Sequence, residues 1–168
     1  MKEIYRSYYS CIRKNMLLFF LNMIFPILTG NVNKFFIRHY TSVIRNHEGL
    51  SGSIDNKVFI RSLFSSPGLY INASNGIKVG KNLLIGPNVS IISSSHDISK
   101  GYPAKANVGS IIIGNDCWLG DGVKILPEVI IGDNTVVAAG SIVNKSFPKG
   151  GCILAGVPAK IVKYMDNK

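Results

Sequence analysis

The sequence of 168 residues contains few cysteines, few histidines and few acidic residues, and each shortage excludes a class of protein. Its three cysteines, Cys11, Cys117 and Cys152, are scattered and odd in number. They form neither a C-x-x-C metal pair nor a disulfide framework, so a reducing compartment is expected. Charged residues make up 17% and hydrophobic residues 46%, which indicates a chain that packs rather than a disordered one. The length allows one ordinary domain with a short appendage.

Nine acidic residues against 19 lysines and arginines leave a net charge of +10. No basic run with interleaved aromatic residues and no helix-turn-helix or zinc-finger pattern accompanies this charge, so we expect no nucleic acid as a partner. Residues 1–50 hold seven basic and two acidic residues, which is half of the excess. A basic, apolar N-terminal segment suggests an anionic membrane surface or an acidic partner. Basic residues elsewhere suit a ligand that carries phosphate.

The sequence also has no apolar run long enough to span a membrane unaided. Residues 16–28 are mainly apolar but include Asn22 and Pro26, and a spanning helix needs about 20 apolar residues. Two basic residues precede the run, as in a signal peptide, but no small-x-small cleavage site follows. With a second apolar cluster at 35–37, residues 1–45 are expected to form two short helices. These helices pack on the body or a neighbouring subunit, or lie in a membrane interface; a cleaved or spanning segment is the least favoured alternative.

A period of six residues runs through the second half of the chain. Residues 111–146 divide into IIIGND, CWLGDG, VKILPE, VIIGDN, TVVAAG and SIVNKS, and residues 77–88 add IKVGKN and LLIGPN. An aliphatic residue every six positions must point into one shared core, and small residues ease the turns between. Three such pieces would close a triangular coil of about 18 residues, and stacked coils would pair parallel strands as in a solenoid. The predicted core positions are Val79, Ile85, Ile91, Ile113, Leu119, Ile125, Ile131, Val137 and Val143.

The run DCWLGDGVKILPEVIIGDNTVVAAGSIVNKSFPKGGCILAGVPAKIVK, with its tryptophan and its closing G-x-P-A-K, resembles the hexapeptide-repeat acyltransferases. It is most similar to their sugar and xenobiotic O-acetyltransferase branch, over about residues 70–163. The resemblance implies a mainly β protein with a left-handed parallel β-helix at 51–163. A helical, apolar and basic segment would occupy 1–50, and a tail 164–168. It also implies acetyl-CoA as acyl donor, no metal, and a homotrimer with active sites at the subunit interfaces.

The repeat breaks once, between Ile91 and Ile113, which are 22 residues apart and therefore out of register with a period of six. The segment between these two residues is polar and contains glycine and proline, which predicts a loop at 93–110. His96 begins this loop, is the only histidine of the repeat region, and is followed by Asp97. A neutral imidazole can accept a proton near neutral pH, and the resemblance implies a catalytic histidine at such a loop. His96 is thus the expected general base, oriented by Asp97 or by a backbone carbonyl.

The resemblance also assigns residues to the two substrates. Trp118 lies beside an inward leucine and should face outward, where it contacts the pantetheine arm of coenzyme A or, alternatively, another subunit. Small residues at 138–139 would let an extended ligand lie close to the coil, and lysines are expected near the cofactor's phosphates, with plain surface lysine as the alternative. The cofactor set is Trp118, Gly120, Ala138, Ala139, Lys145, Lys160 and Lys163. Gly120 is also the candidate backbone donor to the oxyanion, and Asn72 is the candidate contact to the acceptor sugar.

Two other functions fit such a solenoid less well. A zinc carbonic anhydrase needs three histidine ligands, and the repeat region has one. A non-catalytic solenoid would leave His96, Trp118 and the G-x-P-A-K ending without a common explanation. We therefore expect an acetyl-CoA-dependent O-acetyltransferase that acts on a sugar hydroxyl of a bacterial surface polysaccharide or its lipid-linked precursor. A small soluble acceptor, such as serine, a free sugar or a xenobiotic, is the alternative. The expected location is the cytoplasm, at the inner face of the cell membrane if the N-terminal segment binds lipid.

Overall fold

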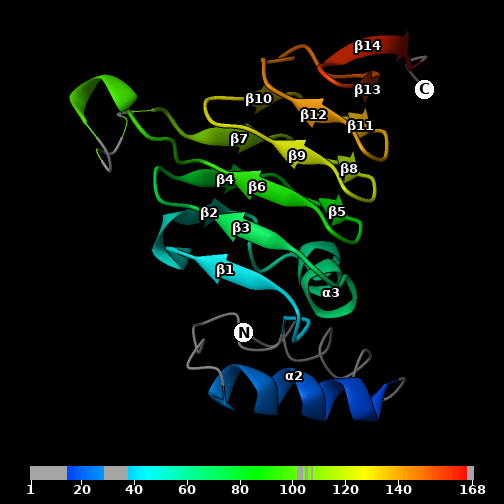
Figure 1. Ribbon diagram of the computed structural model, residues 1–168. Coiled ribbons are helices and arrows are strands. Elements are labelled where there is room, and N and C mark those ends of the chain that lie inside the picture. The colour runs from blue at the N-terminus through cyan, green and yellow to red at the C-terminus, as the bar shows by residue number, and fades with distance from the viewer. Residues whose placement is uncertain (1–14, 29–37, 102–103, 105, 107, 166–168) are drawn as a thin grey trace.

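The computed structural model describes residues 15–28, 38–101, 104, 106 and 108–165. Cys11, the apolar cluster at 35–37 and the end of the tail lie outside the described residues. The described part of the protein is a stack of coils with two helices at its N-terminal end (Figure 1).

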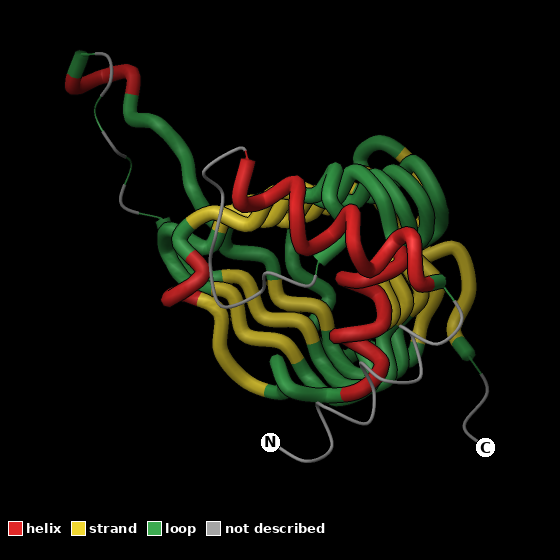
Figure 2. The backbone as a smooth tube through the Cα atoms, turned by 90° about the horizontal axis from the view of Figure 1, so that it is seen from below, coloured by secondary structure: helices red, strands yellow, loops and turns green. Residues whose placement is uncertain are grey.

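Three sheets form the sides of the stack, and all their strands are parallel except the last (Figures 1 and 2). Sheet A contains β1 (Val43–Arg45), β3 (Tyr70–Asn72), β6 (Ser90–Ile92), β9 (Lys124–Ile125) and β12 (Ile142–Val143). Sheet B contains β2 (Leu50–Gly52), β4 (Ile77–Val79), β7 (Ile111–Ile113) and β10 (Ile130–Ile131). Sheet C contains β5 (Leu84–Ile85), β8 (Trp118–Leu119), β11 (Val136–Val137), β13 (Cys152–Gly156) and β14 (Ala159–Tyr164). The polypeptide visits the three sheets in turn, so each circuit is one coil of a parallel β-helix.

The core contains the column of inward aliphatic side chains that the period of six predicts, together with buried residues at other positions such as Leu83 and Val123. All nine predicted positions are buried, with exposed fractions of 2% or less. The register keeps them stacked: Ile71 pairs with Ile91, and Ile91 pairs with Ile125, up one side of the helix. Because equivalent side chains lie above one another, the buried apolar area grows with each added coil, which is how a solenoid is stabilised.

The corners of the coils are built from asparagine and aspartate in a left-handed backbone conformation. Asn82, Asn88 and Asp116 have φ values of 55°, 55° and 54°, a region that these side chains tolerate better than most. Their amides also bridge successive coils: Asn82 Nδ2 donates to Asp116 Oδ1 at 2.8 Å, and Asn88 Nδ2 donates to Asp121 Oδ1 at 3.1 Å. Polar side chains therefore fix the corners while aliphatic ones fill the interior.

The β-helix begins earlier than predicted. β1 pairs with β3 and β2 pairs with β4, so the first coil starts at Val43 and the predicted boundary at residue 50 falls inside it. The short 3-10 helix η1 (His47–Gly49) turns the backbone between these two strands. The prediction of two helices over 1–45 is therefore wrong for residues 43–45, where Ile44 enters the core as strand.

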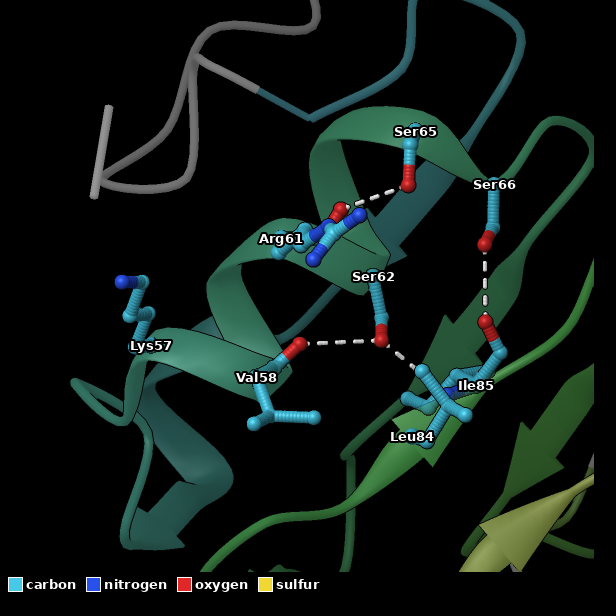
Figure 3. Close-up of a pocket in the computed structure, with 8 residues that line it drawn as sticks. All are labelled: Lys57, Val58, Arg61, Ser62, Ser65, Ser66, Leu84 and Ile85. Atoms are coloured by element: carbon cyan, nitrogen blue, oxygen red, sulfur yellow. Dashed lines mark hydrogen bonds between the residues drawn. The ribbon is translucent and has the colours of Figure 1, made fainter. Parts of the chain in front are cut away.

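A helix, which was not predicted from the sequence, takes the place of the sheet C strand in this first coil. Helix α3 (Lys57–Ser65) lies below β5, with Asn56 capping its first turn through a 2.9 Å bond from Val58 N–H. Two serines at its C-terminal end bond the edge of β5. Ser62 Oγ accepts from Ile85 N–H at 3.1 Å, and Ser66 Oγ donates to the Ile85 carbonyl at 2.7 Å (Figure 3). The lower edge of sheet C is thus closed by side-chain hydroxyls.

The upper edge of sheet C is closed by a hairpin. β14 runs antiparallel to β13, with Gly156 opposite Ala159 at the turn. This turn contains the G-x-P-A-K motif, so the motif ends the solenoid by folding the backbone onto its last strand.

Helix α2 (Met16–Leu28) lies beneath the stack (Figure 1) and packs through a short side that is not its most apolar one. Its buried residues are Asn22 and Pro26, the two that interrupt the apolar run. Asn22 Oδ1 accepts from Tyr40 N–H at 2.8 Å, and its Nδ2 donates to the Phe64 carbonyl at 3.4 Å. The exposed side is apolar: Met16, Leu17, Phe20, Met23, Ile24, Phe25, Ile27 and Leu28. Across the described ranges, no helix is both long enough and apolar enough to cross a membrane.

Candidate functional site

The interrupted repeat forms an arm that projects from the corner between sheets A and B (Figure 2). The arm leaves β6 and returns at β7. Its two sides are bonded to each other, by Asp97 N–H to the Ala104 carbonyl at 2.9 Å and by Ala106 N–H to the Ser95 carbonyl at 3.1 Å. His96 lies between these two bonds and is exposed. The predicted loop at 93–110 is therefore present, and it presents His96 to the outside of the corner.

The structure brings Asn72 and His96 to the same corner. Asn72 ends β3, one coil below, and its Nδ2 donates to Ser94 Oγ at 3.1 Å, two residues before His96. Its Oδ1 accepts from the Ser74 hydroxyl at 2.6 Å, and its backbone carbonyl accepts from Ser93 N–H at 2.9 Å. The start of the arm is thus tied to the coil beneath it at several points, which the sequence alone did not indicate.

The carboxylate of Asp97 forms its hydrogen bonds and its ion pair within the arm. It caps the 3-10 helix η2 (Ile98–Lys100), accepting from Ser99 N–H at 3.0 Å and from the Ser99 hydroxyl at 2.6 Å. Lys100 Nζ lies 3.3 Å from its Oδ2. The bonds from Ser99, followed by the contact with Lys100, lower the pKa of Asp97 below its ordinary value. These contacts hold the Asp97 carboxylate against residues 99 and 100, and the role of Asp97 toward His96 stays a prediction.

Trp118 faces outward on sheet C, as predicted, in a column of apolar side chains. It pairs in register with Leu84 below and Val136 above, and Val136 pairs with Ile153. The indole is 49% exposed and Leu84 is 44% exposed. Large apolar side chains exposed in a row on one face of a sheet mark a surface that binds a ligand or another protein.

The turns that follow Trp118 and Val137 lie at the corner between sheets C and A. Gly120 is buried there, and a Cβ on it would lie only 2.7 Å from Ala139 N, so the two turns can stack only with glycine at 120. Gly120 N–H already donates to the Val137 carbonyl at 2.8 Å. It cannot serve an oxyanion without breaking the ladder, so the sequence-based choice of Gly120 as that donor is wrong. The next N–H groups in these turns, of Asp121 and Ala139, have no acceptor among the described residues.

The three predicted cofactor lysines lie in two places. Lys160 and Lys163 are exposed on β14, at the top of sheet C, opposite Ala155 and Ile153 of β13. Lys145 follows β12 at the corner between sheets A and B, where its Nζ lies 5.6 Å from the centre of the Phe147 ring. Only the first two share a face with Trp118.

The predicted site residues therefore fall into two groups on opposite sides of the same protomer. His96 and Trp118 belong to the same coil, but the corner between sheets A and B lies opposite sheet C in a three-sided helix. Figure 1 shows the arm leaving on the left while the sheet C strands lie on the right. Within one protomer, the imidazole and the indole therefore face different sides of the helix. Within the described part of the protein, no cluster of three or more histidine, cysteine, aspartate or glutamate side chains could hold a metal.

Comparison with known proteins agrees with this architecture. Residues 110–145 match the family model described as bacterial transferase hexapeptide (six repeats). Residues 110–145 thus carry the hexapeptide repeat that this family model describes. Galactoside O-acetyltransferase of Escherichia coli is 34% identical over 110 residues, which are 64% of this chain and 54% of that protein. An Escherichia coli protein named for lipopolysaccharide biosynthesis O-acetyl transfer is 32% identical over 60% of this chain and 56% of its own length.

Solved structures of hexapeptide-repeat proteins extend the likeness to the fold. A hexapeptide-repeat acetyltransferase of Vibrio cholerae superposes with a TM-score of 0.57 and 25% identity, covering 77% of this chain and 65% of that one. A galactoside acetyltransferase in complex with coenzyme A gives a TM-score of 0.51 and 28% identity over 70% of this chain and 64% of its own. The predicted left-handed β-helix of this family is confirmed. The protein spans about half the length of the curated relatives it matches.

Proposed function

We propose that the protein is an acetyl-CoA-dependent O-acetyltransferase that acts on a sugar hydroxyl. One observation carries the proposal. Asn72, the residue expected to contact the acceptor sugar, is hydrogen-bonded to Ser94, two residues before His96. An exposed imidazole at the corner that also holds the Asn72 amide suits an acceptor that offers a hydroxyl. The names of the relatives, galactoside O-acetyltransferase among them, support the same class of acceptor.

The proposed step needs one base and one oxyanion donor. The imidazole of His96 removes the proton of the sugar hydroxyl as its oxygen attacks the thioester carbon of acetyl-CoA. The tetrahedral intermediate then collapses, the C–S bond breaks, and the protonated imidazole returns its proton to the departing thiolate. Asp121 N–H and Ala139 N–H are the candidate donors to the oxyanion, because they are the unused N–H groups beside Gly120 and Ala138.

A homotrimer would complete this site. With threefold packing, the arm of one protomer reaches sheet C of the next, and the His96 corner then faces Trp118 of that neighbour. This arrangement accounts for the placement of the two groups on opposite sides of one protomer, and it gives the exposed apolar column of sheet C a partner or a ligand to cover it.

The donor is proposed to lie along sheet C of the neighbouring protomer. Its pantetheine arm would pack on Trp118 and pass the small side chains of Ala138 and Ala139. Lys160 and Lys163, higher on the same face, would then meet the phosphates as point charges. Lys145 lies at the other corner, so its contact with the cofactor also requires the trimer.

The lower end of the trimer is proposed to contact a membrane. Helix α2 turns its polar residue Asn22 inward and exposes an apolar side, the reverse of an ordinary surface helix. The net charge of +10 would favour an anionic surface. Peripheral binding at the inner face of the cell membrane makes a lipid-linked precursor of a surface polysaccharide the favoured acceptor. In this proposal the N-terminal segment contacts the membrane and the β-helix carries the catalytic site.

Replacement of His96 tests the proposed activity. We expect His96→Ala to lower kcat with acetyl-CoA and a sugar acceptor by at least about 10²-fold, while coenzyme A still binds. Ser95→Ala, one residue earlier in the same arm, serves as the matched control for loop structure. Turnover by His96→Ala within a few fold of the wild type would overturn the assignment of the base.

A further inference from the structure

A groove of about 430 Å³ lies between α3 and the edge of β5 (Figure 3). Lys57, Arg61 and Ser65 are spaced four residues apart and line its helical side, and Leu84 lines the opposite side. The volume falls within the range of small-molecule sites. Since Ser62 and Ser66 hold the helix to β5 by hydrogen bonds, the walls of the groove are fixed relative to each other.

The groove is cationic, and none of its lining residues is acidic. Among the described residues, neither Lys57 nor Arg61 forms an ion pair, and Asp55, two residues before Lys57, does not line the groove. The Ser65 hydroxyl donates to the Arg61 carbonyl at 2.8 Å, which leaves its lone pairs outward but no proton for a ligand. The donors available to a ligand are therefore the ammonium and the guanidinium.

The groove continues the face that carries Trp118. Leu84 pairs in register with Trp118, so the groove lies one coil below the indole on sheet C. The proposed donor runs upward from Trp118 toward Lys160 and Lys163 at the top of the sheet. An acceptor that meets the thioester at the level of His96 must then lie on the lower side, level with Asn72 of one protomer and the groove of the next.

We propose that the groove binds the phosphates of an acceptor whose sugar is attached to a diphosphate. This inference rests on the proposed function, and it names the acceptor more narrowly as a glycosyl diphosphate. A guanidinium binds phosphate oxygens in a bidentate manner and a lysine adds a point charge, whereas a neutral free sugar would leave both cations unused. Leu84 would pack on the apolar part of the acceptor.

Two acceptors share this chemistry, a sugar nucleotide and a lipid-linked sugar diphosphate. Helix α2, with its exposed apolar side, lies at the same end of the protein as the groove (Figure 1). The arms of the test are therefore a uridine-diphosphate sugar, a polyprenyl-diphosphate sugar in anionic vesicles, and the corresponding free sugar.

The test compares acceptor preference in the full-length wild type, Arg61→Gln and Lys57→Gln. Each variant should lower the ratio of kcat/KM for a diphosphate-linked sugar to kcat/KM for the free sugar by about 10-fold, the loss of one charge-assisted contact. Lys78→Gln is the matched control, because Lys78 is exposed on sheet B and its replacement removes the same charge outside the groove. An unchanged ratio in both groove variants, or an equal change in the control, overturns the proposal.

Binding of inorganic pyrophosphate by calorimetry separates this proposal from the proposed activity. Arg61→Gln should weaken pyrophosphate binding by about 10-fold, and Lys78→Gln should not. If the wild type acetylates no sugar but this pattern is seen, the anion site stands and the acetyltransferase proposal fails. If the wild type acetylates sugars but pyrophosphate binding is equal in all variants, the groove proposal fails and the activity stands.

Discussion

Mixed trimers would reveal whether the active site is shared between protomers. His96→Ala removes the base from the arm, and Trp118→Ala removes the indole from sheet C, on the opposite side of the same protomer. In randomly mixed trimers with equal amounts of the two variants, each site has a chance of about one half to receive an intact arm. It has the same chance to receive an intact face, so about one quarter of the sites should be complete. Activity should rise to about one quarter of the wild-type value, well above either parent.

The structure also supplies a control pair for this experiment. Asn72 and His96 lie at the same corner of one protomer, joined through Ser94. A mixture of Asn72→Ala and His96→Ala should therefore stay inactive, because every corner carries one of the two defects. Co-expressed trimers, verified by light scattering and assayed with acetyl-CoA, provide the measurement. Recovery in the control pair, or no recovery in the His96→Ala and Trp118→Ala mixture, would refute the proposed arrangement.

Further predictions concern stability, thiol chemistry and membranes. Ser62→Ala leaves the buried N–H of Ile85 without its acceptor and should lower the free energy of unfolding by about 1–3 kcal/mol; exposed Ser65→Ala should change it by less, and equal losses in urea titrations would contradict this role. Burial raises the pKa of Cys117 from its ordinary value of 9.0 to about 11. The Cys117 thiol should thus resist alkylation at pH 8, and fast labelling of Cys117 in peptide mass mapping would disprove this. The contribution of the thiol to stability should be lost as pH rises from about 9 through 11, because the thiol of the unfolded protein ionises first. The full-length protein should co-sediment with anionic vesicles at low salt, and Ile24→Asp, on the exposed side of α2, should weaken that binding. Equal binding of the wild type to neutral vesicles would reject the electrostatic part.

The period of six predicted the third-position residues of the core, but not the buried first-position residues such as Leu83 and Val123. Ile91, Ile125 and the other third-position residues are buried because their spacing in the sequence equals the spacing of the sides of the coil. The sequence also located the arm, since 22 residues between Ile91 and Ile113 cannot be divided into whole pieces of six. A repeat thus reports which side chains share an interior, and a break in it reports where the backbone leaves that interior.

The first coil was harder to predict because its repeat is degenerate. Helix α3 occupies the place of a strand, and its signal was the spacing of Phe59, Leu63 and Phe64 behind the capping residue Asn56. In helix α2 the apolar run predicted the helix but not which side faces inward, which is the side of Asn22. Burial of Asn22 depends on partners at Tyr40 and Phe64, and distant partners of this kind have no local signature.

The site was predictable as a set of residues but not as an arrangement. Family resemblance indicated both His96 and Trp118, yet only the order of the three sheets places them on opposite sides of one protomer. The choice of Gly120 as oxyanion donor failed for a related reason. Its N–H bonds the next coil, and such a bond between coils becomes visible only when the stacking is known. Lys57 and Arg61 gave no signal, because a lysine and an arginine four positions apart are ordinary on a helix.

Transfer of an acetyl group from acetyl-CoA to a sugar is the most direct test of the account. Wild-type protein is incubated with isotopically labelled acetyl-CoA and a panel of free, nucleotide-linked and lipid-linked sugars, and products are analysed by mass spectrometry beside His96→Ala. The account predicts labelled acetyl ester on a sugar hydroxyl with the wild type and at least about 100-fold less with His96→Ala. Absence of labelled product with every sugar, or equal product from the variant, would contradict it.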